Sequence, residues 1–243
     1  MSVVICKKCG LVQTNPRMTL KSYYEFYNSE YRKLLDATDE IQSIFREHYA
    51  KGKLIYEYIK TVMGKPIENG FVVEIGTSTG GILKFFQERG NEVFGLDLGE
   101  KYIEFGKEKG LNLKVGTVEK LSELDRKPDL VILSHVVEHF LNPIKELEKI
   151  TQYLKPESLI YIEVPGIRNL PFQYNQDFLE YLQIAHTYHF TLESLINCCQ
   201  KVGLELISGN VSVHSLFKVG KKNNYRSDYD STINFLKELE NAR

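Results

Sequence analysis

Hydrophobic residues fall into two patterns that alternate along most of the chain. Short apolar runs stand at 71–75, 92–97, 129–134 and 158–165. Between them lie longer segments whose apolar residues are spaced three or four positions apart. The short runs predict buried strands, and the longer spacing predicts amphipathic helices. The chain is therefore expected to alternate strands with helices.

This alternation indicates an α/β fold. The expected helices cover 40–63, 79–90, 99–110, 142–154 and 191–203. LNLKVG supplies a fifth strand among the helices, and LELISGNVS and HSLFKVGK predict two final strands. Strands separated by helices favour a parallel sheet that is covered on both faces. Ligands of such sheets bind beyond the carboxyl ends of the strands.

Composition narrows the class of partners. The 243 residues suit one α/β domain with small additions, and 42% hydrophobic residues are enough for a core. The net charge of −1 gives no basic footprint, so we expect no nucleic-acid partner. No apolar stretch approaches the roughly 20 residues of a membrane helix, so we expect no membrane partner. The four cysteines do not form a secreted disulfide pattern, which favours a cytoplasmic protein.

Two strand ends carry candidate ligand-binding residues. The first strand ends in EIGTSTG, where Gly76 and Gly80 allow a tight turn and close approach to a ligand. Asp97 stands at the tip of the next strand, where a carboxylate can bind the hydroxyls of a ribose. A dinucleotide fingerprint would need a third glycine where this chain has Ser78. Together, loop and acid point to a cofactor with a nucleoside. Alternatively, the glycines only form a tight turn that packs a helix, and Asp97 is only a solvated acid at a strand end.

Over roughly residues 40–220 the sequence resembles class I S-adenosylmethionine-dependent methyltransferases. The likeness rests on VVEIGTSTG, GLDLG, DLVILSHVVEHFLNP and LKPESLIYIEVP. It implies a doubly wound, mostly parallel seven-stranded Rossmann-like sheet with an antiparallel last strand and helices on both faces. It implies S-adenosylmethionine as cofactor, with Asp97 on the ribose, and Leu98 beside the adenine. Thr117 stands where relatives often carry an Asp. The residues so assigned to the cofactor are Glu74, Gly76, Thr77, Gly80, Asp97, Leu98, Thr117 and Ser134.

The stretch SHVVEHF contains the His-x-x-Glu-His pattern of one class of zinc metalloprotease. Such enzymes need both histidines on one helix face, but His135 directly follows a predicted strand. We therefore expect no metal here, although metal-assisted transfer through Glu138 and His139 stays open. The resemblance implies hydrogen bonding near the cofactor for Glu138 and His139, and a place at the mouth of the substrate pocket for His135.

A second histidine stretch bears on the methyl acceptor. AHTYHFTLESL resembles the Glu-His-x-x-Tyr-Phe-(Ser/Thr) motif of sugar-modifying methyltransferases, with His186 on the motif's histidine. His189 stands in place of the Tyr, and Ala185 in place of the Glu. His186 is thus a candidate base or substrate anchor, because histidine titrates near neutral pH. Alternatively it only caps the helix that begins near Thr191. Together with His186, His135 and His139 are the candidate catalytic residues.

The N-terminal segment carries Cys6-x-x-Cys9-Gly, which resembles half of the zinc ribbon found in relatives that act on nucleotide-sugars. A closed zinc site needs four ligands and only two stand here, so zinc binding stays open. We expect a ribbon remnant and aromatic lid segment at 1–39, a methyltransferase domain at 40–220 and a terminal helix at 221–243. The insert at 166–190 is expected on the substrate side, with its aromatic residues either lining a pocket or packing the insert.

The expected function is O-methylation of a small molecule, with a sugar or nucleotide-sugar as acceptor by resemblance. Methylation of a quinone-type phenol is the alternative within enzymes. A catalytically silent module that binds the cofactor or a partner is the alternative outside enzymes. A nucleotide-dependent oxidoreductase is disfavoured by Ser78. Neither the acceptor nor the oligomeric state follows from the sequence.

Overall fold

The computed structural model describes residues 2–26, 38–173, 177–183, 185–223 and 226–241. The chain forms two compact units. Unit 1 comprises Met1–Arg17, Ser134–Thr151 and Tyr161–Arg243, and unit 2 comprises Met18–Leu133 and Gln152–Ile160. We describe each unit by itself.

The elements follow the predicted alternation through the middle of the chain. The strands are β1 (Val3–Ile5), β2 (Val12–Thr14), β3 (Phe71–Ile75), β4 (Glu92–Asp97), β5 (Leu113–Val115), β6 (Leu130–Ser134), β7 (Leu159–Glu163), β8 (Tyr188–His189), β9 (Leu204–Gly209) and β10 (His214–Val219). The α-helices are α1 (Leu20–Glu25), α3 (Thr38–Met63), α4 (Gly81–Gln87), α5 (Glu100–Glu108), α6 (Pro143–Gln152), α7 (Phe178–Tyr181), α8 (Leu192–Lys201) and α9 (Tyr229–Asn241). The 3₁₀ segments are η2 (Val118–Glu123), η3 (Val137–His139) and η4 (Ile167–Phe172).

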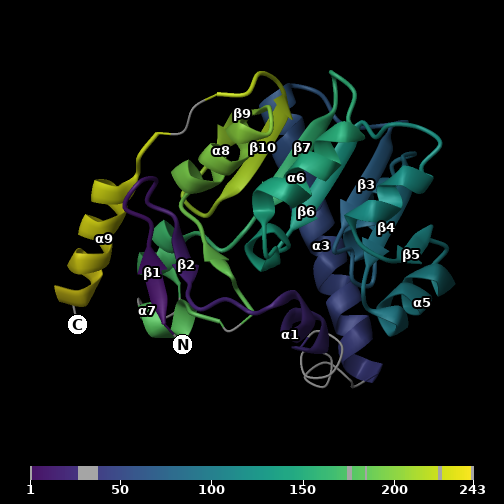
Figure 1. Ribbon diagram of the computed structural model, residues 1–243. Helices are drawn as coiled ribbons and strands as arrows, with labels where there is room; N and C mark the ends of the chain where they lie inside the picture. Colours follow the sequence, from purple (N-terminus) through teal and green to yellow (C-terminus); the bar gives the residue numbers. More distant parts are fainter. Residues whose placement is uncertain (1, 27–37, 174–176, 184, 224–225, 242–243) are drawn as a thin grey trace. The chain divides into compact units, whose positions relative to one another are not determined.

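Among the described residues, seven strands form one sheet in the order β5-β4-β3-β6-β7-β10-β9 (Figure 1). Strand β3 pairs in parallel with both β4 and β6, whereas β9 and β10 are antiparallel. This confirms the predicted Rossmann-like sheet. The chain runs outward from β3 through β4 to β5 and then returns to the other side of β3. The strand order therefore reverses between β3 and β6, where sheets of this type bind their ligands.

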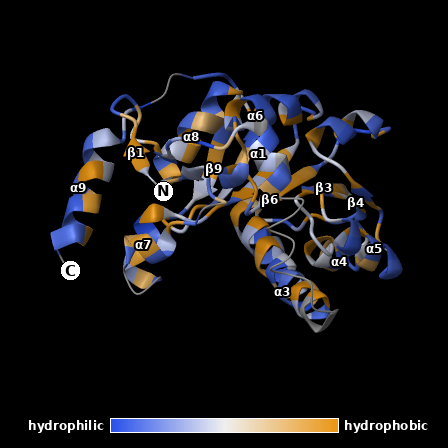
Figure 2. Ribbon diagram, turned by 60° about the horizontal axis from the view of Figure 1, so that its bottom comes forward, coloured by the Kyte–Doolittle hydropathy of each residue, from blue (hydrophilic) through white to orange (hydrophobic). Residues whose placement is uncertain are grey.

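The buried positions of unit 2 follow the sequence pattern closely. All five residues of β3 are buried, as the continuous apolar run predicts. Helix α3 buries Ile41, Phe45, Ile55 and Ile59, and Figure 2 shows hydrophobic and hydrophilic residues interleaved along it. Leu54 of the same helix is 71% exposed. No helix in the described part of the chain combines the length and hydrophobicity that a membrane span needs.

Helix α4 is shorter than the predicted 79–90. Gly80 has a φ of 80° and precedes the helix, and Gly90 has a φ of 79° just beyond it. Both lie in the left-handed region, which glycine enters without steric cost. A Cβ on Gly81 would stand 2.4 Å from the carbonyl oxygen of Phe45 in α3. This close helix contact fixes the position of the loop that precedes α4.

An N-terminal β-hairpin in unit 1 was not expected from the sequence. Strands β1 and β2 are antiparallel, and β2 pairs with β8, with Val12 opposite His189 and Gln13 opposite Tyr188. Arg17 donates to the carbonyl of Leu141 at 3.0 Å and to the Tyr188 hydroxyl. These strands are two or three residues long, so they carry too little alternation to be found by pattern. The hairpin holds the segment that contains the second histidine stretch.

The 166–190 insert packs onto this hairpin. Tyr181 is buried with Val12, Ile167 and Leu170, and Phe178 stacks on Tyr181 with ring centroids 5.9 Å apart. These two aromatic residues therefore serve packing, one of the two roles considered above. Phe172 is 80% exposed. Tyr174 of the insert and Tyr27 and Tyr31 of the aromatic N-terminal segment lie outside the described residues.

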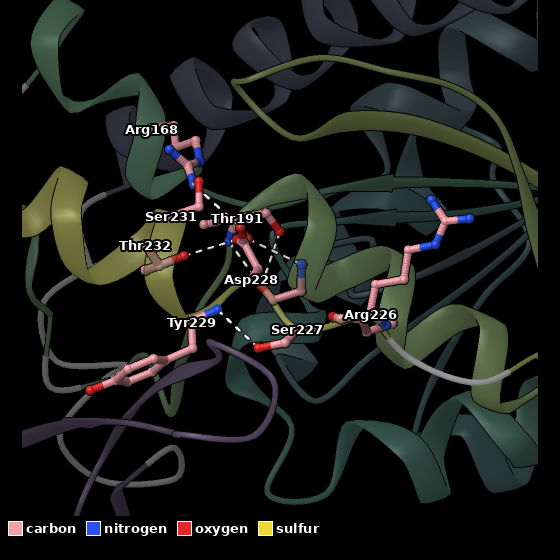
Figure 3. A network of polar contacts seen from close by, with 10 residues as sticks. Arg168, Thr191, Arg226, Ser227, Asp228, Tyr229, Ser231 and Thr232 are labelled. Atoms are coloured by element: carbon pink, nitrogen blue, oxygen red, sulfur yellow. Dashed lines mark hydrogen bonds and ion pairs between the residues drawn. The ribbon is translucent and has the colours of Figure 1, made fainter.

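The C-terminal helix α9 is anchored to the start of α8 by a buried carboxylate. Figure 3 shows Asp228 accepting hydrogen bonds from the hydroxyls of Thr191 and Thr232, each at 2.8 Å. Arg168 lies 3.4 Å from the same carboxylate and donates to Ser231 at 2.6 Å. The side chain of Thr191 also caps α8. One acid thus joins two helices and the 3₁₀ segment η4.

Candidate functional site

The glycine loop between β3 and α4 bends back over the end of β4. Gly76, Ser78 and Gly80 have positive φ values of 74°, 49° and 80°. The N–H groups of Gly76 and Thr77 both donate to the carbonyl of Leu96, at 2.7 and 2.9 Å. Ser78 adopts the left-handed conformation without being a glycine, which is uncommon for other residues. The loop is therefore held in a strained, defined shape by β4.

Asp97 lies against this loop, as the sequence predicted. Its carboxylate accepts hydrogen bonds from the N–H of Ser78 at 2.9 Å and the N–H of Gly99 at 2.7 Å. Two backbone donors fix the orientation of the carboxylate. The carbonyl of Asp97 also accepts from the N–H of Gly116 at 2.9 Å, which brings the end of β5 to the same place.

Glu74 is buried beneath the loop with 1% of its surface exposed. It accepts a hydrogen bond from the Thr77 hydroxyl at 2.8 Å. Burial raises the pKa of Glu74 to about 8; the Thr77 hydrogen bond opposes this shift, and the negative charge of Asp97 adds to it. At neutral pH this carboxyl is therefore mostly protonated. Its visible role is to hold the loop through Thr77.

The remaining residues assigned to the cofactor follow the ends of strands. Leu98 after β4 and Thr117 after β5 are half-buried, and the Thr117 hydroxyl donates to Glu119. Ser134 ends β6, and its hydroxyl donates to Glu163 at 3.3 Å. In the loop itself, the fully buried hydroxyl of Thr79 has no hydrogen-bond partner among the described residues. A buried polar group without a partner fits a site completed by a polar ligand.

A second group of titratable residues lies in unit 1. We call it the histidine cluster: Glu138 with His135, His139, His186 and His189. Glu138 is 1% exposed, and neither carboxylate oxygen has a hydrogen-bond partner in the described structure. The nearest ring nitrogens are His135 Nδ1 at 3.4 Å and His139 Nε2 at 3.9 Å from Oε1. A buried carboxylate without donors is costly, so this cluster needs an explanation.

Backbone contacts assemble the cluster from distant segments. The N–H of Thr187 donates to the carbonyl of Glu138 at 2.9 Å. His139 Nδ1 lies 3.0 Å from the carbonyl of Ala185, and the Thr14 hydroxyl donates to the carbonyl of His186 at 3.0 Å. The ring centroids of His139 and His186 are 4.9 Å apart. The hairpin, η3 and the segment before β8 therefore meet at this point.

The cluster combines the carboxylate of Glu138 with the uncharged imidazoles of His186 and His189. Burial opposes ionisation of Glu138, but His135, His139 and His186 together hold its pKa below the usual value. Burial lowers the pKa of His186 to about 4, and the neighbouring His139 lowers it further while Glu138 opposes the shift. Burial likewise lowers the pKa of His189 to about 4. Near pH 7 both imidazoles are therefore uncharged.

Two of the alternatives from the sequence are decided by local geometry. His135 has a φ of 54° and precedes η3, which is a single 3₁₀ turn from Val137 to His139. The two histidines therefore do not share a helix face, and the metalloprotease arrangement is absent. His186 does not cap α8, because the Thr191 hydroxyl accepts from the Ser194 N–H at 3.1 Å and forms a capping box. The Glu138, His139 and His186 ligand atoms nevertheless lie within 4.8 Å of one another.

Glu163 at the end of β7 was missed by the sequence reasoning. Its carboxylate is buried and receives the hydroxyls of Ser134 and Tyr161, each at 3.3 Å. His135 Nε2 lies 3.2 Å from the same carboxylate, so His135 stands between Glu163 and Glu138. The signal was present, because an acid within the apolar run LIYIEVP stands at a strand end where ligands bind.

The cysteine turn lies between β1 and β2. The N–H of Gly10 donates to the carbonyl of Cys6 at 2.8 Å. Burial by itself would raise the pKa of the Cys6 thiol, but the backbone N–H groups of Cys9 and Lys8 outweigh burial, so this pKa is lowered. Burial raises the pKa of the Cys9 thiol. In the described part of the chain neither cysteine belongs to a group of three close metal ligands.

Comparisons with known proteins agree with this geometry. The family model described as a methyltransferase domain matches residues 45–209. No curated protein matches the chain. Among solved structures, the plantazolicin methyltransferase BamL, in complex with a triazolic desmethylPZN analog and SAH, is 18% identical. The match covers 92% of this chain and 85% of that one, with a TM-score of 0.59.

Two further structures are similar. A 1,6-didemethyltoxoflavin-N1-methyltransferase from Burkholderia thailandensis is 15% identical, with 91% of this chain and 98% of that chain covered and a TM-score of 0.59. A SAM-dependent methyltransferase from Archaeoglobus fulgidus is 26% identical, with 63% and 69% covered and a TM-score of 0.51. The plantazolicin and 1,6-didemethyltoxoflavin methyltransferases are less than 25% identical to this chain, so their likeness shows the fold alone. The family model spans well over half of the sequence, with the glycine loop and Asp97 inside it. The chain therefore belongs to the methyltransferase domain family.

Proposed function

We propose that this protein transfers a methyl group from S-adenosylmethionine to a hydroxyl oxygen of a sugar or nucleotide-sugar. Membership of the family makes the protein a methyltransferase, and S-adenosylmethionine is its cofactor. The observation that carries the cofactor assignment is the contact between the Asp97 carboxylate and the Ser78 N–H. It joins the ribose-binding acid of the resemblance directly to the glycine loop.

Apart from Ser134, the residues assigned to the cofactor site belong to unit 2. When bound, S-adenosylmethionine supplies a methyl group on a positively charged sulfur. Asp97 would hold the ribose hydroxyls, and the loop from Gly76 to Gly80 would hold the methionine part. Leu98 would lie beside the adenine, with Thr117 nearby. Glu74 would act through Thr77 by keeping the loop in shape, since its carboxyl is buried and mostly protonated near pH 7.

The acceptor side is assigned to His186, His135 and His139. The acceptor oxygen forms a bond to the methyl carbon while the carbon–sulfur bond breaks, and the sulfur keeps that electron pair. The hydroxyl proton must leave the acceptor in this step. His186 is uncharged near pH 7 and buried beside Glu138, so it can take that proton or accept a hydrogen bond from the hydroxyl. The nearby anion of Glu138 would stabilise the resulting imidazolium.

The choice of a sugar rests on the likeness of AHTYHF to a sugar-methyltransferase motif and on the N-terminal cysteine turn. The solved neighbours leave this choice open, since they act on a desmethylPZN analog and on 1,6-didemethyltoxoflavin. A quinone-type phenol is the alternative acceptor. A protein that binds the cofactor without transferring the methyl group is the alternative outside enzymes.

The test is a product screen with purified protein and S-adenosylmethionine. Separate pools contain free sugars, nucleotide-sugars and phenols, and mass spectrometry follows a mass gain of one methyl group together with S-adenosylhomocysteine. A methyl ether formed only with the sugar pools is the expected result. Product from phenols alone would overturn the sugar assignment. Cofactor binding by calorimetry without product from any pool would favour the silent module.

A further inference from the structure

We propose that Glu138, His139 and His186 form a binding site for a divalent first-row transition-metal ion. From the sequence, metal-assisted transfer through Glu138 and His139 is an open alternative, but His135 and His139 do not share a helix face. The structure replaces His135 by His186, which comes from a segment about 50 residues further along the chain. No metal is needed for the fold to form the group, since backbone contacts already hold it together.

The first argument is the buried carboxylate of Glu138. Both of its oxygens lack a hydrogen-bond partner among the described residues, and the side chain is 1% exposed. Buried charges in proteins are paired, hydrogen-bonded or bound to metal. Imidazoles surround this carboxylate at 3.4 and 3.9 Å, which is too far for good hydrogen bonds. A cation bound between the Glu138 carboxylate and the imidazoles would neutralise the negative charge of Glu138.

The second argument is the orientation of His139. Its Nδ1 lies 3.0 Å from the carbonyl oxygen of Ala185, which can only accept a hydrogen bond. The proton therefore sits on Nδ1, and the lone pair is on Nε2, the atom 3.9 Å from Glu138. Metal-binding histidines characteristically donate their other ring N–H to a carbonyl or carboxylate in this way. His139 thus carries the arrangement of a ligand.

The third argument is the distance among the donor atoms. All three lie within 4.8 Å of one another. Donors bound at about 2.0–2.2 Å to one zinc ion can be at most about 4.4 Å apart, so small rotations of the side chains would close the site. His189 stands next to it, with ring centroids 6.3 Å from His186 and both ring nitrogens buried without hydrogen-bond partners in the described structure.

The donor set decides the class of metal. Two imidazoles and one carboxylate suit Zn²⁺ or Fe²⁺ and leave coordination positions open, whereas Mg²⁺ prefers oxygen ligands. The role of the ion in catalysis rests on the proposed function. Because the His186 nitrogen that binds the ion cannot accept a proton, the ion would take over that role: it would polarise the acceptor hydroxyl and ease loss of its proton to water. The binding site itself does not depend on that role.

Binding is tested with Co²⁺, whose visible absorption reports nitrogen and oxygen ligands without an activity assay. Chelator-treated wild-type protein is expected to bind one Co²⁺ with new visible bands, and Zn²⁺ should displace it whereas Mg²⁺ should not. His186→Ala and Glu138→Gln should each weaken binding on the order of 100-fold. Circular dichroism and thermal melting confirm that each variant is folded.

The matched control separates this site from the cysteine turn. A Cys6→Ser, Cys9→Ser double variant should bind Co²⁺ as the wild type does, and so should His48→Gln, which removes a histidine from α3 in unit 2. The proposal is overturned if wild-type protein binds no Co²⁺ or Zn²⁺. It is also overturned if the metal is lost in the cysteine variant but retained by folded His186→Ala and Glu138→Gln. Metal binding without methyl transfer to any acceptor would leave the site in place and refute only the proposed function.

Discussion

The glycine loop and the histidine cluster solve the problem of buried polar groups in opposite ways. In the loop, Asp97 receives two backbone N–H donors, and Glu74 receives the Thr77 hydroxyl and becomes mostly protonated near neutral pH. In the cluster, the neighbouring histidines hold the pKa of Glu138 below its usual value, and the His135 ring nitrogen lies 3.4 Å from its carboxylate. The carboxyl groups of the loop thus have close donors, whereas the Glu138 carboxylate has imidazoles only at 3.4 and 3.9 Å.

The two regions also differ in how the chain builds them. The loop joins residues of consecutive elements, β3 and β4, which lie side by side in a parallel sheet. The cluster needs Thr14, Glu138 and His186, which come from three separate stretches of the chain. A contiguous loop carries a sequence motif, and an assembled cluster does not. In the proposed function, the loop would recognise the cofactor that the family shares, and the cluster would serve the acceptor of this protein.

The largest effect is expected from His186→Ala, which breaks the cluster alone. With the acceptor found in the product screen, kcat/KM should fall by about 10²–10⁴-fold, because removal of the hydroxyl proton is impaired. Calorimetry should give an unchanged Kd for S-adenosylmethionine, because the residues assigned to the cofactor's nucleoside and methionine parts belong to unit 2. His48→Gln serves as the control for loss of a histidine. A fall in cofactor affinity equal to the fall in kcat/KM would show that the two regions are not separable.

A smaller effect is expected from Glu74→Gln on the pH dependence of stability. The folded state keeps the Glu74 proton up to about pH 8, whereas the unfolded chain releases it near the usual value of 4.5. This carboxyl therefore stabilises the fold fully below pH 4.5, and the stabilisation is lost as the pH rises through 8. The wild-type free energy of unfolding should fall by about 1.4 kcal/mol per pH unit between these values from this group.

Urea unfolding at pH 5 and pH 7 measures this contribution. In Glu74→Gln the decrease between the two pH values should be smaller by roughly 2–3 kcal/mol. The exposed Glu57→Gln variant is the control, since it removes a carboxyl from α3 without burial. Equal pH dependence in Glu74→Gln and wild type would mean that Glu74 is ionised in the folded protein.

The smallest effect is expected from Asp97→Ala, which breaks the loop site alone. Charged hydrogen bonds of this kind contribute about 1.5–3 kcal/mol, so the Kd for S-adenosylmethionine should rise roughly 10- to 100-fold. Calorimetry measures the Kd, and a urea titration separates lost binding from a disturbed loop. The exposed Asp125→Ala is the matched control. Co²⁺ binding at the cluster should be unaffected, and an unchanged Kd would refute the role of Asp97.

The apolar runs and the glycine positions were enough to predict the sheet and the glycine loop. Short continuous apolar runs bounded by glycines or other turn residues favour buried strands, and β3 and β4 have the predicted ends. Gly76, Gly80 and Asp97 stand at strand ends, and strand order alone brings such residues together. These features depend on neighbouring residues and on one general rule of parallel sheets.

The surroundings of Glu138, in contrast, could not be predicted from the residue pattern. The hairpin strands β1 and β2 are too short to show a period, and their pairing with β8 spans most of the chain. The His-x-x-Glu-His pattern suggested His135 as the partner of His139, but His135 turns toward both Glu163 and Glu138 while His186 approaches His139. Which distant segments meet depends on packing across the whole unit, and no local pattern in the sequence records that choice.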